Sequence, residues 1–254
     1  MLPLIKIGSV EIYTFPIIIL LAIYVSALYL IKSARYSLER LKELFKLLLL
    51  SLPLVFLCGK LLFFLGKWKA GEIIQTTDLL FGGIVFYGGL IGGIISFLLY
   101  CKIRNRNIFE YTDIVSSVLP LAQAIGRIGC FLNGCCYGIL YDGFFSVQYP
   151  LNSEIVRVFP VWFLECLLCV LLFGILQQKK CYETKGWMTC FYVVGYSFIR
   201  FIVEFFRGDT IRGAWGYLST SQIISVIFIV LGIVILFILK TIKNKKKDIS
   251  KGCL

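Results

Sequence analysis

The sequence predicts an all-α integral membrane protein that crosses the bilayer seven times. Hydrophobic residues make up 59% of the 254 residues and charged residues 16%, whereas soluble domains average about 45–50% apolar and about 25% charged. The apolar residues fall into blocks of about 20, the length of helix that crosses roughly 30 Å of hydrocarbon. Connections rich and poor in Lys and Arg alternate along the chain. Together these observations exclude a disordered chain, a nucleic-acid-binding protein and a secreted disulfide-linked domain.

Seven apolar blocks are the predicted spans. They are residues 14–31, 47–66, 79–101, 114–138, 158–177, 187–206 and 222–239. The first block is long enough to span and lacks the charged start of a signal peptide, so we expect no cleavage there. The fourth block contains Gln123, Arg127 and Asn133, so part of it could be broken or re-entrant. We predict one transmembrane domain over residues 1–239, followed by a basic tail over residues 240–254.

The basic residues predict the orientation of these spans. Alternate connections, taken with the tail, hold 17 Lys and Arg, whereas the remaining connections and the N-terminal segment hold 6. Because cytoplasmic connections carry the excess of positive charge, we expect the N-terminus outside and the C-terminus in the cytoplasm. The net charge of +12 is therefore interpreted mainly as an orientation signal, together with attraction to anionic lipids.

Ionisable side chains are costly in a membrane helix and are functional candidates for that reason. The predicted spans contain five of them: Lys60, Arg127, Glu165, Arg200 and Glu204. Arg127 lies among glycines that leave room for a ligand, and a guanidinium group matches phosphate oxygens with two parallel hydrogen bonds. The alternative is that Arg127 pairs with Glu165 or Glu204 and only holds helices together.

A second polar run shares one helix face. Tyr196, Arg200 and Glu204 are spaced four residues apart, and Arg207 follows at the predicted outer end. An internally paired ladder of Arg200, Glu204 and Arg207 is the alternative to a ligand site. Even that ladder would leave one positive charge for an anion to balance. The residues therefore predict an outward-facing cationic cavity for an anionic lipid head group, and leave open whether the lipid is transformed, moved or only bound.

Two other motifs favour packing over chemistry. The glycine-rich residues 86–93 form small-residue faces at a spacing of four, and Tyr87 is the proton-carrying group there. Cys130, Cys135 and Cys136 do not follow the usual spacing of zinc ligands, and the chain contains no histidine. We therefore predict no metal site.

The motifs resemble those of the bacterial prolipoprotein diacylglyceryl transferase family over nearly the whole chain. Residues 126–138 resemble its signature G-R-x-G-N-F-x-N-G-E-x-x-G, and residues 200–207 match its R-x-x-V-E-F-F-R run. Residues 86–92 are similar to its S-F-H-G-G-L-I-G run. Further similarities lie at Ile7-Gly8, at Pro160 and Glu165, and at Gly213-Ala214-Trp215, Ser219 and Gln222.

The resemblance implies a multi-pass enzyme of the bacterial inner membrane that uses no cofactor. Such an enzyme transfers a diacylglyceryl group from phosphatidylglycerol to the lipobox cysteine thiol of a preprolipoprotein and releases glycerol 1-phosphate. Its partners would be these two substrates and membrane lipids, with no nucleic acid. The implied catalytic residues are Arg200, which would stabilise the departing phosphate, and Tyr87. The implied substrate-binding residues are Arg127, Asn133, Gly138, Tyr196, Glu204, Arg207 and Lys60, of which Tyr196 and Glu204 would orient Arg200.

The chain departs from the family motifs at several positions. Cys130 and Cys135 stand at the Asn and Glu of the signature, Tyr87 stands at a motif His, and Phe15 and Lys60 stand at a Tyr and an Arg. Tyrosine has an ordinary pKa of roughly 10 and is a poor base at neutral pH. Three functions therefore stay open: conventional transfer, a divergent paralogue with another lipid-dependent transfer, and non-catalytic binding or transport of anionic lipid.

Overall fold

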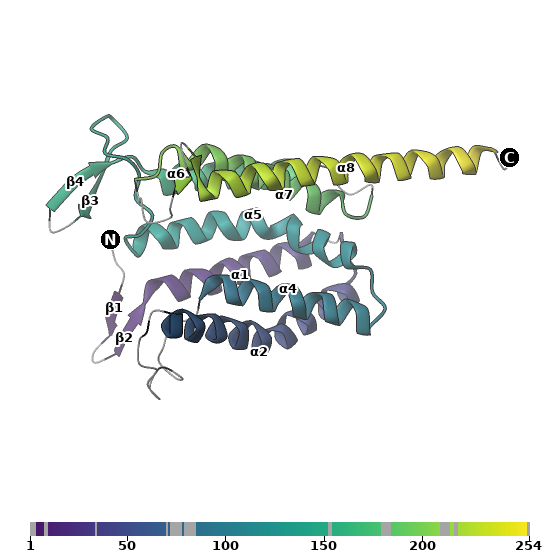
Figure 1. The fold of residues 1–254 in the computed structure, drawn as a ribbon, viewed down its shortest axis with the longest axis horizontal. Coiled ribbons are helices and arrows are strands. Elements are labelled where there is room, and N and C mark those ends of the chain that lie inside the picture. The colour runs from purple at the N-terminus through teal and green to yellow at the C-terminus, as the bar shows by residue number, and fades with distance from the viewer. Residues whose placement is uncertain are drawn as a thin grey trace. The chain divides into compact units, whose positions relative to one another are not determined.

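The computed structural model describes residues 4–7, 10–33, 35–69, 71, 78, 85–151, 154–178, 184–208, 214–215 and 218–252. Within them the chain forms seven helices and three two-stranded antiparallel sheets (Figure 1). The helices are α1 (Thr14–Lys32), α2 (Leu38–Lys69), α4 (Phe86–Ile103), α5 (Ile108–Leu132), α6 (Val161–Leu176), α7 (Trp187–Glu204) and α8 (Thr220–Gly252). The strands are β1 (Leu4–Ile7), β2 (Val10–Tyr13), β3 (Val147–Leu151), β4 (Glu154–Val158), β5 (Ala214–Trp215) and β6 (Leu218–Ser219). The mostly helical prediction is confirmed, and the short hairpins are an addition to it.

Each predicted block overlaps one helix, but some of the boundaries were wrong. Helix α2 begins at Leu38, well before the predicted apolar block. Helix α5 ends at Leu132, because Gly134 and Cys136 adopt positive φ angles of 65° and 59° that a helix does not accommodate. Helix α8 continues to Gly252, so the residues predicted as a separate tail extend this helix. Residues 79–84, the start of the third predicted block, lie outside the described residues.

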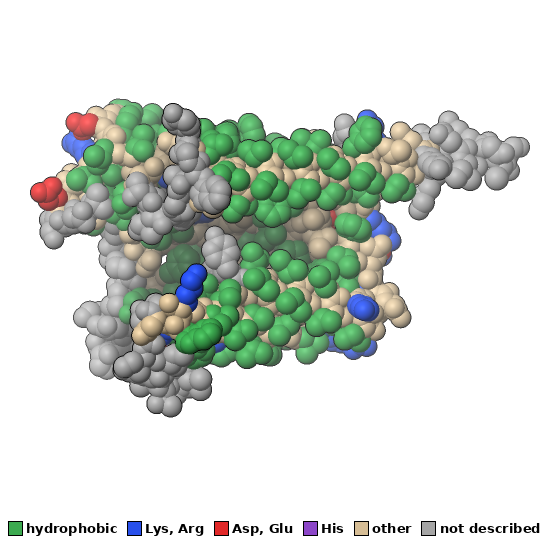
Figure 2. Space-filling view, in the orientation of Figure 1, with side chains coloured by type: hydrophobic (Ala, Val, Ile, Leu, Met, Phe, Trp, Pro, Cys, Tyr) green, Lys and Arg blue, Asp and Glu red, His purple; other side chains and the backbone are tan. Residues whose placement is uncertain are grey.

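The surface of the helices is suited to lipid. Helices α1, α2, α5 and residues 220–244 of α8 are long and apolar enough to cross a membrane, and shorter apolar helices cover residues 88–103 and 161–176. Large apolar side chains are exposed along their flanks (Figure 2). Leu20, Leu50 and Phe237, for example, are 67%, 66% and 71% exposed. Apolar surface this extensive would be unfavourable in water, which supports a membrane protein.

Two compact units make up the chain. One unit contains Met1–Lys32 and Thr112–Leu254, and the other contains Ser33–Tyr111. In the first unit α7 packs against both α6 and α8. Its core contains Val161, Leu172, Leu176, Met188, Ile199 and Val203. In the second unit α2 packs against α4.

The start of α7 is fixed by a carboxylate from α5. Asp113 accepts hydrogen bonds from the backbone N–H groups of Gly186, at 2.6 Å, and Thr189, at 2.9 Å. These are groups of the first turn, which have no partner within the helix itself. Asp113 therefore caps α7 and joins it to α5.

Glycines let α2 and α4 approach closely. A Cβ atom added to Gly88 would lie 2.3 Å from the carbonyl oxygen of Cys58, and one added to Gly92 would lie 2.4 Å from that of Leu54. Since these contacts are to backbone, no side-chain rotation can relieve them. The glycine-rich run therefore joins helix to helix, as small residues do in membrane proteins.

We expect Gly92→Ala to lower the thermal unfolding midpoint of the detergent-solubilised protein. The new methyl group would press on the Leu54 carbonyl group, and overpacking costs about 1–3 kcal/mol. The matched control is Gly93→Ala, whose Cβ would lie 3.7 Å from the Val55 side chain, an ordinary contact. That control should be neutral or slightly stabilising, because alanine favours a helix over glycine by about 1 kcal/mol. Equal midpoints for the two variants would contradict the close approach.

Candidate functional site

Two arginines from different helices meet at one buried carboxylate. The Nη2 atom of Arg127, on α5, lies 2.6 Å from Oε1 of Glu165, on α6. The Nη1 atom of Arg200, on α7, lies 3.5 Å from Oε2 of the same carboxylate. The Glu165 side chain is only 2% exposed, and the two arginine side chains are 18% and 13% exposed. A buried Arg–Glu–Arg cluster therefore joins α5, α6 and α7.

Neighbouring polar groups hold this cluster in place. Arg200 also pairs with Glu204 through Nη2 at 3.0 Å, one helical turn along α7. The hydroxyl group of Tyr196 donates to Oε1 of Glu165 at 3.4 Å. The ring of Tyr196 stacks on that of Tyr192, with 5.9 Å between centroids. The spacing of four residues thus places Tyr196, Arg200 and Glu204 around one carboxylate.

Ion pairs that the sequence suggested as an alternative to a ligand site are present in the structure. Arg127 pairs with Glu165, and Arg200 pairs with Glu204. These pairs use only part of the donor capacity, because each guanidinium group has five N–H donors. The remaining N–H donors of Arg127 and Arg200 can bind the oxygens of an anion such as phosphate.

A close backbone crossing brings Arg207 to the loop after α5. Gly138 pairs with Arg207 in an antiparallel bridge, and the N–H group of Gly208 donates to the carbonyl oxygen of Tyr137 at 3.1 Å. A Cβ atom on Gly138 would lie 2.2 Å from the carbonyl oxygen of Phe159. Glycine at position 138 is therefore required by the packing of three backbone segments.

The loop after α5 carries the end of the motif that contains Arg127. Asn133 is exposed at the end of this helix. The backbone then turns through Gly134, and the N–H group of Cys135 donates to the carbonyl oxygen of Cys130 at 3.0 Å. This turn places Cys135 and Cys136 next to Cys130, although they follow it by five and six residues.

Lys60 and Tyr87 belong to the other compact unit. Lys60 is 6% exposed, and its Nζ atom donates to the backbone oxygen of Asp78 at 2.9 Å. The same atom lies 5.8 Å from the ring centroids of Phe56 and Phe63. Tyr87 is the second residue of α4, and its side chain lies outside the described part of the chain. A role for either residue stays a prediction.

The sequence-based site omitted its central residue. Glu165 contacts Arg127, Arg200 and Tyr196. It is one of the five ionisable residues of the predicted spans, but the predicted catalytic and substrate-binding residues do not include it. The signal was a carboxylate within the strongly apolar segment that forms α6. Sequence could not show that two arginines share this carboxylate, because that depends on how α5, α6 and α7 face one another.

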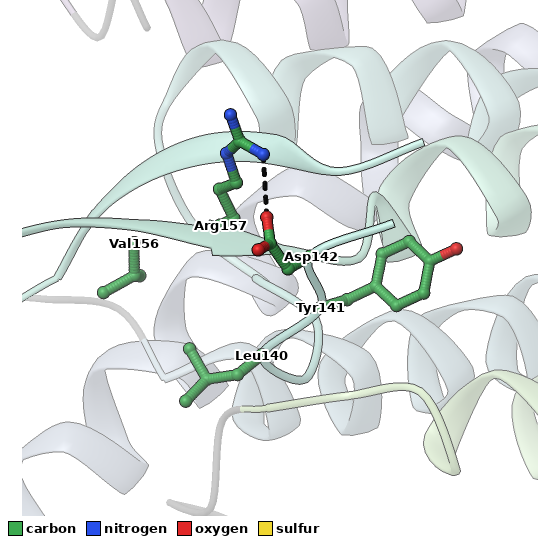
Figure 3. A pocket seen from close by; sticks show the side chains of 5 residues that line it. All are labelled: Leu140, Tyr141, Asp142, Val156 and Arg157. Atoms are coloured by element: carbon green, nitrogen blue, oxygen red, sulfur yellow. Dashed lines mark hydrogen bonds and ion pairs between the residues drawn. The ribbon is translucent and has the colours of Figure 1, made fainter. Parts of the chain in front are cut away.

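An open groove lies at a different place, beside the hairpin of β3 and β4. Its volume is about 700 Å³, and Leu140, Tyr141, Asp142, Val156 and Arg157 line it (Figure 3). Arg157 pairs with Asp142 at 2.7 Å, but their side chains are 58% and 80% exposed. Exposed pairs of this kind contribute only about 0–1 kcal/mol. We assign no chemistry to this groove.

Comparison with known proteins identifies the family. The prolipoprotein diacylglyceryl transferase family profile matches residues 3–238. The chain belongs to this family. Similar proteins include phosphatidylglycerol–prolipoprotein diacylglyceryl transferase 2 of Clostridium perfringens, 33% identical over 97% of this chain and 98% of that protein. The phosphatidylglycerol–prolipoprotein diacylglyceryl transferase of Clostridium tetani is 35% identical to this chain, over 91% of this chain and 94% of that protein. The protein of the same name from Clostridioides difficile is 29% identical, over 96% of each chain.

Three members of the buried cluster lie at motif positions of this transferase family. Arg127 belongs to the run that resembles the family signature, Arg200 belongs to the run that matches R-x-x-V-E-F-F-R, and Glu165 corresponds to the glutamate of a third motif. These motifs are far apart in sequence, and their side chains meet within hydrogen-bonding distance. The cluster is therefore the candidate functional site.

We expect Glu165→Gln to destabilise the protein more than Glu204→Gln. Glu165 balances two buried guanidinium groups, and removing one partner of a buried ion pair costs about 3–5 kcal/mol. Glu204→Gln leaves Arg200 paired with Glu165 and should be milder. Thermal unfolding midpoints in one detergent would test the order. A larger loss for Glu204→Gln would show that Glu165 is not the central counter-ion.

Proposed function

We propose that the chain is a multi-pass enzyme of the bacterial cell membrane that makes lipoproteins. It transfers a diacylglyceryl group from phosphatidylglycerol to the lipobox cysteine thiol of a preprolipoprotein and releases glycerol 1-phosphate. Family membership and the names of the relatives support the activity. The meeting of Arg127 and Arg200 at Glu165 is the observation that carries the proposed site.

The proposed reaction replaces a carbon–oxygen bond with a carbon–sulfur bond. The cysteine sulfur attacks the glyceryl carbon that carries the phosphate, and the electron pair of the broken bond goes to the phosphate oxygen. The thiol proton is released. The phosphate group gains one negative charge as it leaves, so a preorganised cation beside it lowers the barrier. Arg200 has this role, and Glu204, Glu165 and Tyr196 hold its guanidinium group in position.

Arg127 binds the phosphate or glycerol of the lipid before the reaction. Its guanidinium group is planar and permanently charged, which suits recognition of phosphate by two hydrogen bonds. Asn133 donates hydrogen bonds to the head group, and Gly138 lets the loop that follows Asn133 pack closely on the backbone of Phe159. Arg207, whose backbone pairs with Gly138, adds a further permanently charged group for the head group. Glu165 keeps the arginines close despite their mutual repulsion, so that one phosphate can reach both.

Lys60 and Tyr87, which belong to the second unit, are further candidates that the family motifs suggest. Tyr87 stands at the position of the motif histidine and receives the thiol proton if a base is needed. A nearby cation such as Lys60 would favour its deprotonated form. Strong stabilisation of the leaving phosphate by Arg200 reduces the need for such a base.

Cys130 and Cys135 favour a second candidate function. They replace an amide and a carboxylate of the family signature, so the pocket for the head group or the acceptor could differ in this chain. A paralogue would then carry out another lipid-dependent transfer through the same arginines. Its distinguishing property would be release of glycerol 1-phosphate without lipidation of a lipobox peptide.

We expect a reporter at the C-terminus to be cytoplasmic and one at the N-terminus to be external. Seven crossings follow if α4, α6 and α7 span the membrane with the four longer helices, and the basic connections orient them. A phosphatase that is active only outside the cytoplasm and a fluorescent protein that folds in the cytoplasm would test both ends. Both ends on the same side would contradict an odd number of crossings.

We expect Arg200→Lys to reduce transfer by about 10²–10³-fold, the typical effect of losing one stabilising donor. Lysine keeps the charge but loses the planar pair of donors. The measurement is glycerol 1-phosphate release from phosphatidylglycerol, together with lipidation in cells depleted of their own transferase. Arg157→Lys is the matched control and should retain activity, because Arg157 is exposed and its side chain pairs with the exposed Asp142.

Two outcomes would contradict the proposal. A well-expressed wild-type chain that neither lipidates nor releases glycerol 1-phosphate would exclude transfer from phosphatidylglycerol. Full activity of Arg200→Lys would remove Arg200 from the site and leave the transferase assignment standing on the family alone.

A further inference from the structure

Three cysteine thiols converge where α5 ends. Cys130 lies in the last turns of the helix, and Cys135 and Cys136 lie in the loop that follows. Their Sγ atoms all lie within 4.8 Å of one another, and the thiols are free. Three thiolates bound to one zinc ion at bonds of about 2.3 Å would be roughly 4 Å apart. The thiols therefore need only small side-chain movements to bind a single ion.

The backbone around these thiols is held in an uncommon conformation. Gly134 and Cys136 have φ angles of 65° and 59°, and Cys136 is one of two described non-glycine residues with positive φ. For a residue with a Cβ atom, this left-handed conformation raises the free energy of the folded state by roughly 1–2 kcal/mol. The hydroxyl group of Tyr149 donates to the carbonyl oxygen of Gly134 and supports the turn. The turn brings Cys136 back beside Cys130.

Two guanidinium groups flank the thiols. The Nη1 atom of Arg127 lies 4.0 Å from Sγ of Cys130, and the side chain of Arg207 is hydrogen-bonded to Cys136. Adjacent cations favour the thiolate, which is the form that binds metal. The cluster therefore has both the geometry and the electrostatic surroundings of a ligand set.

A small cavity adjoins two of the thiols. Cys135 and Cys136 line it with Phe131, Trp162 and Tyr149, among others, and its volume is about 10 Å³. A cavity of this volume has room for about one water molecule. The cavity can thus supply a fourth, water ligand and is far too small for a lipid head group.

We propose that Cys130, Cys135 and Cys136 form a zinc site whose fourth ligand is water. The three thiols release their protons to solvent as the ion binds. Three thiolates and Zn²⁺ together carry one negative charge, which the guanidinium group of Arg127 beside Cys130 can stabilise. A monovalent copper ion would leave two negative charges and a poorer balance. The prediction of no metal site assumed that a fourth ligand would have to be a histidine. A water molecule as the fourth ligand removes that requirement.

The test uses the full-length protein in detergent, reduced and freed of metal. Titration with Zn²⁺ against a chromophoric chelator, and with Cd²⁺ followed by its thiolate charge-transfer absorption, should give one equivalent bound. Changing any one of the three cysteines to serine should weaken binding by at least about 100-fold, since loss of outer partners alone costs 10–100-fold. Cys58→Ser, on α2, is the matched control and should bind as the wild type does.

Protection of the thiols gives a second measurement on the unaltered protein. Bound Zn²⁺ should slow alkylation of Cys130, Cys135 and Cys136, as measured by mass spectrometry, and leave the alkylation of Cys58 unchanged. Unprotected thiols in the presence of Zn²⁺ would overturn the proposal. Unchanged affinity in the three serine variants, or failure of the reduced wild type to bind either ion, would also overturn it. None of these readouts depends on the transferase activity.

Discussion

The buried carboxylate of Glu165 is the interaction on which the candidate site depends. Two guanidinium groups in a medium of low dielectric constant repel each other strongly, and they can lie close together only when an anion lies between them. Glu165 forms an ion pair with Arg127 through one oxygen and with Arg200 through the other. The orientation of α5, α6 and α7 is thereby tied to the position of two cations. A phosphate that enters the site therefore meets guanidinium N–H donors that the fold already holds in position.

Backbone contacts outside the cluster keep these helices in register. Asp113 joins the start of α7 to α5, and the crossing of Gly138 with Gly208 joins the end of α7 to the loop after α5. Helix α7 is therefore fixed at both ends against the chain segment that carries Arg127. Because Arg200 lies between these two contacts, its distance to Glu165 is set by backbone geometry as well as by charge.

Hydropathy predicted the approximate positions of the helices, because the part of a helix that lies within a membrane must be mostly apolar. The end of α5 was not predictable in this way, since the apolar character continues through the turn at Gly134 and Cys136. The spacing of four residues correctly placed Tyr196, Arg200 and Glu204 on one face of α7. Two features could not be predicted: that Arg127 and Arg200 share Glu165, and that the three thiols converge. Both depend on contacts between separate segments, and the spacing of residues within one segment gives no information about them.

The thiol cluster and the arginine cluster are electrostatically coupled. Arg127 contacts both Glu165 and Cys130, so a charge placed on the thiols acts on the guanidinium group that would bind lipid phosphate. A lipid phosphate and a zinc–thiolate group would each place negative charge beside the guanidinium group of Arg127. Two ligands that compete for one charge weaken each other, and linkage makes the effect equal in both directions. Zinc bound at Cys130, Cys135 and Cys136 would therefore reduce the affinity for phosphatidylglycerol, and bound lipid would reduce the affinity for zinc by the same factor.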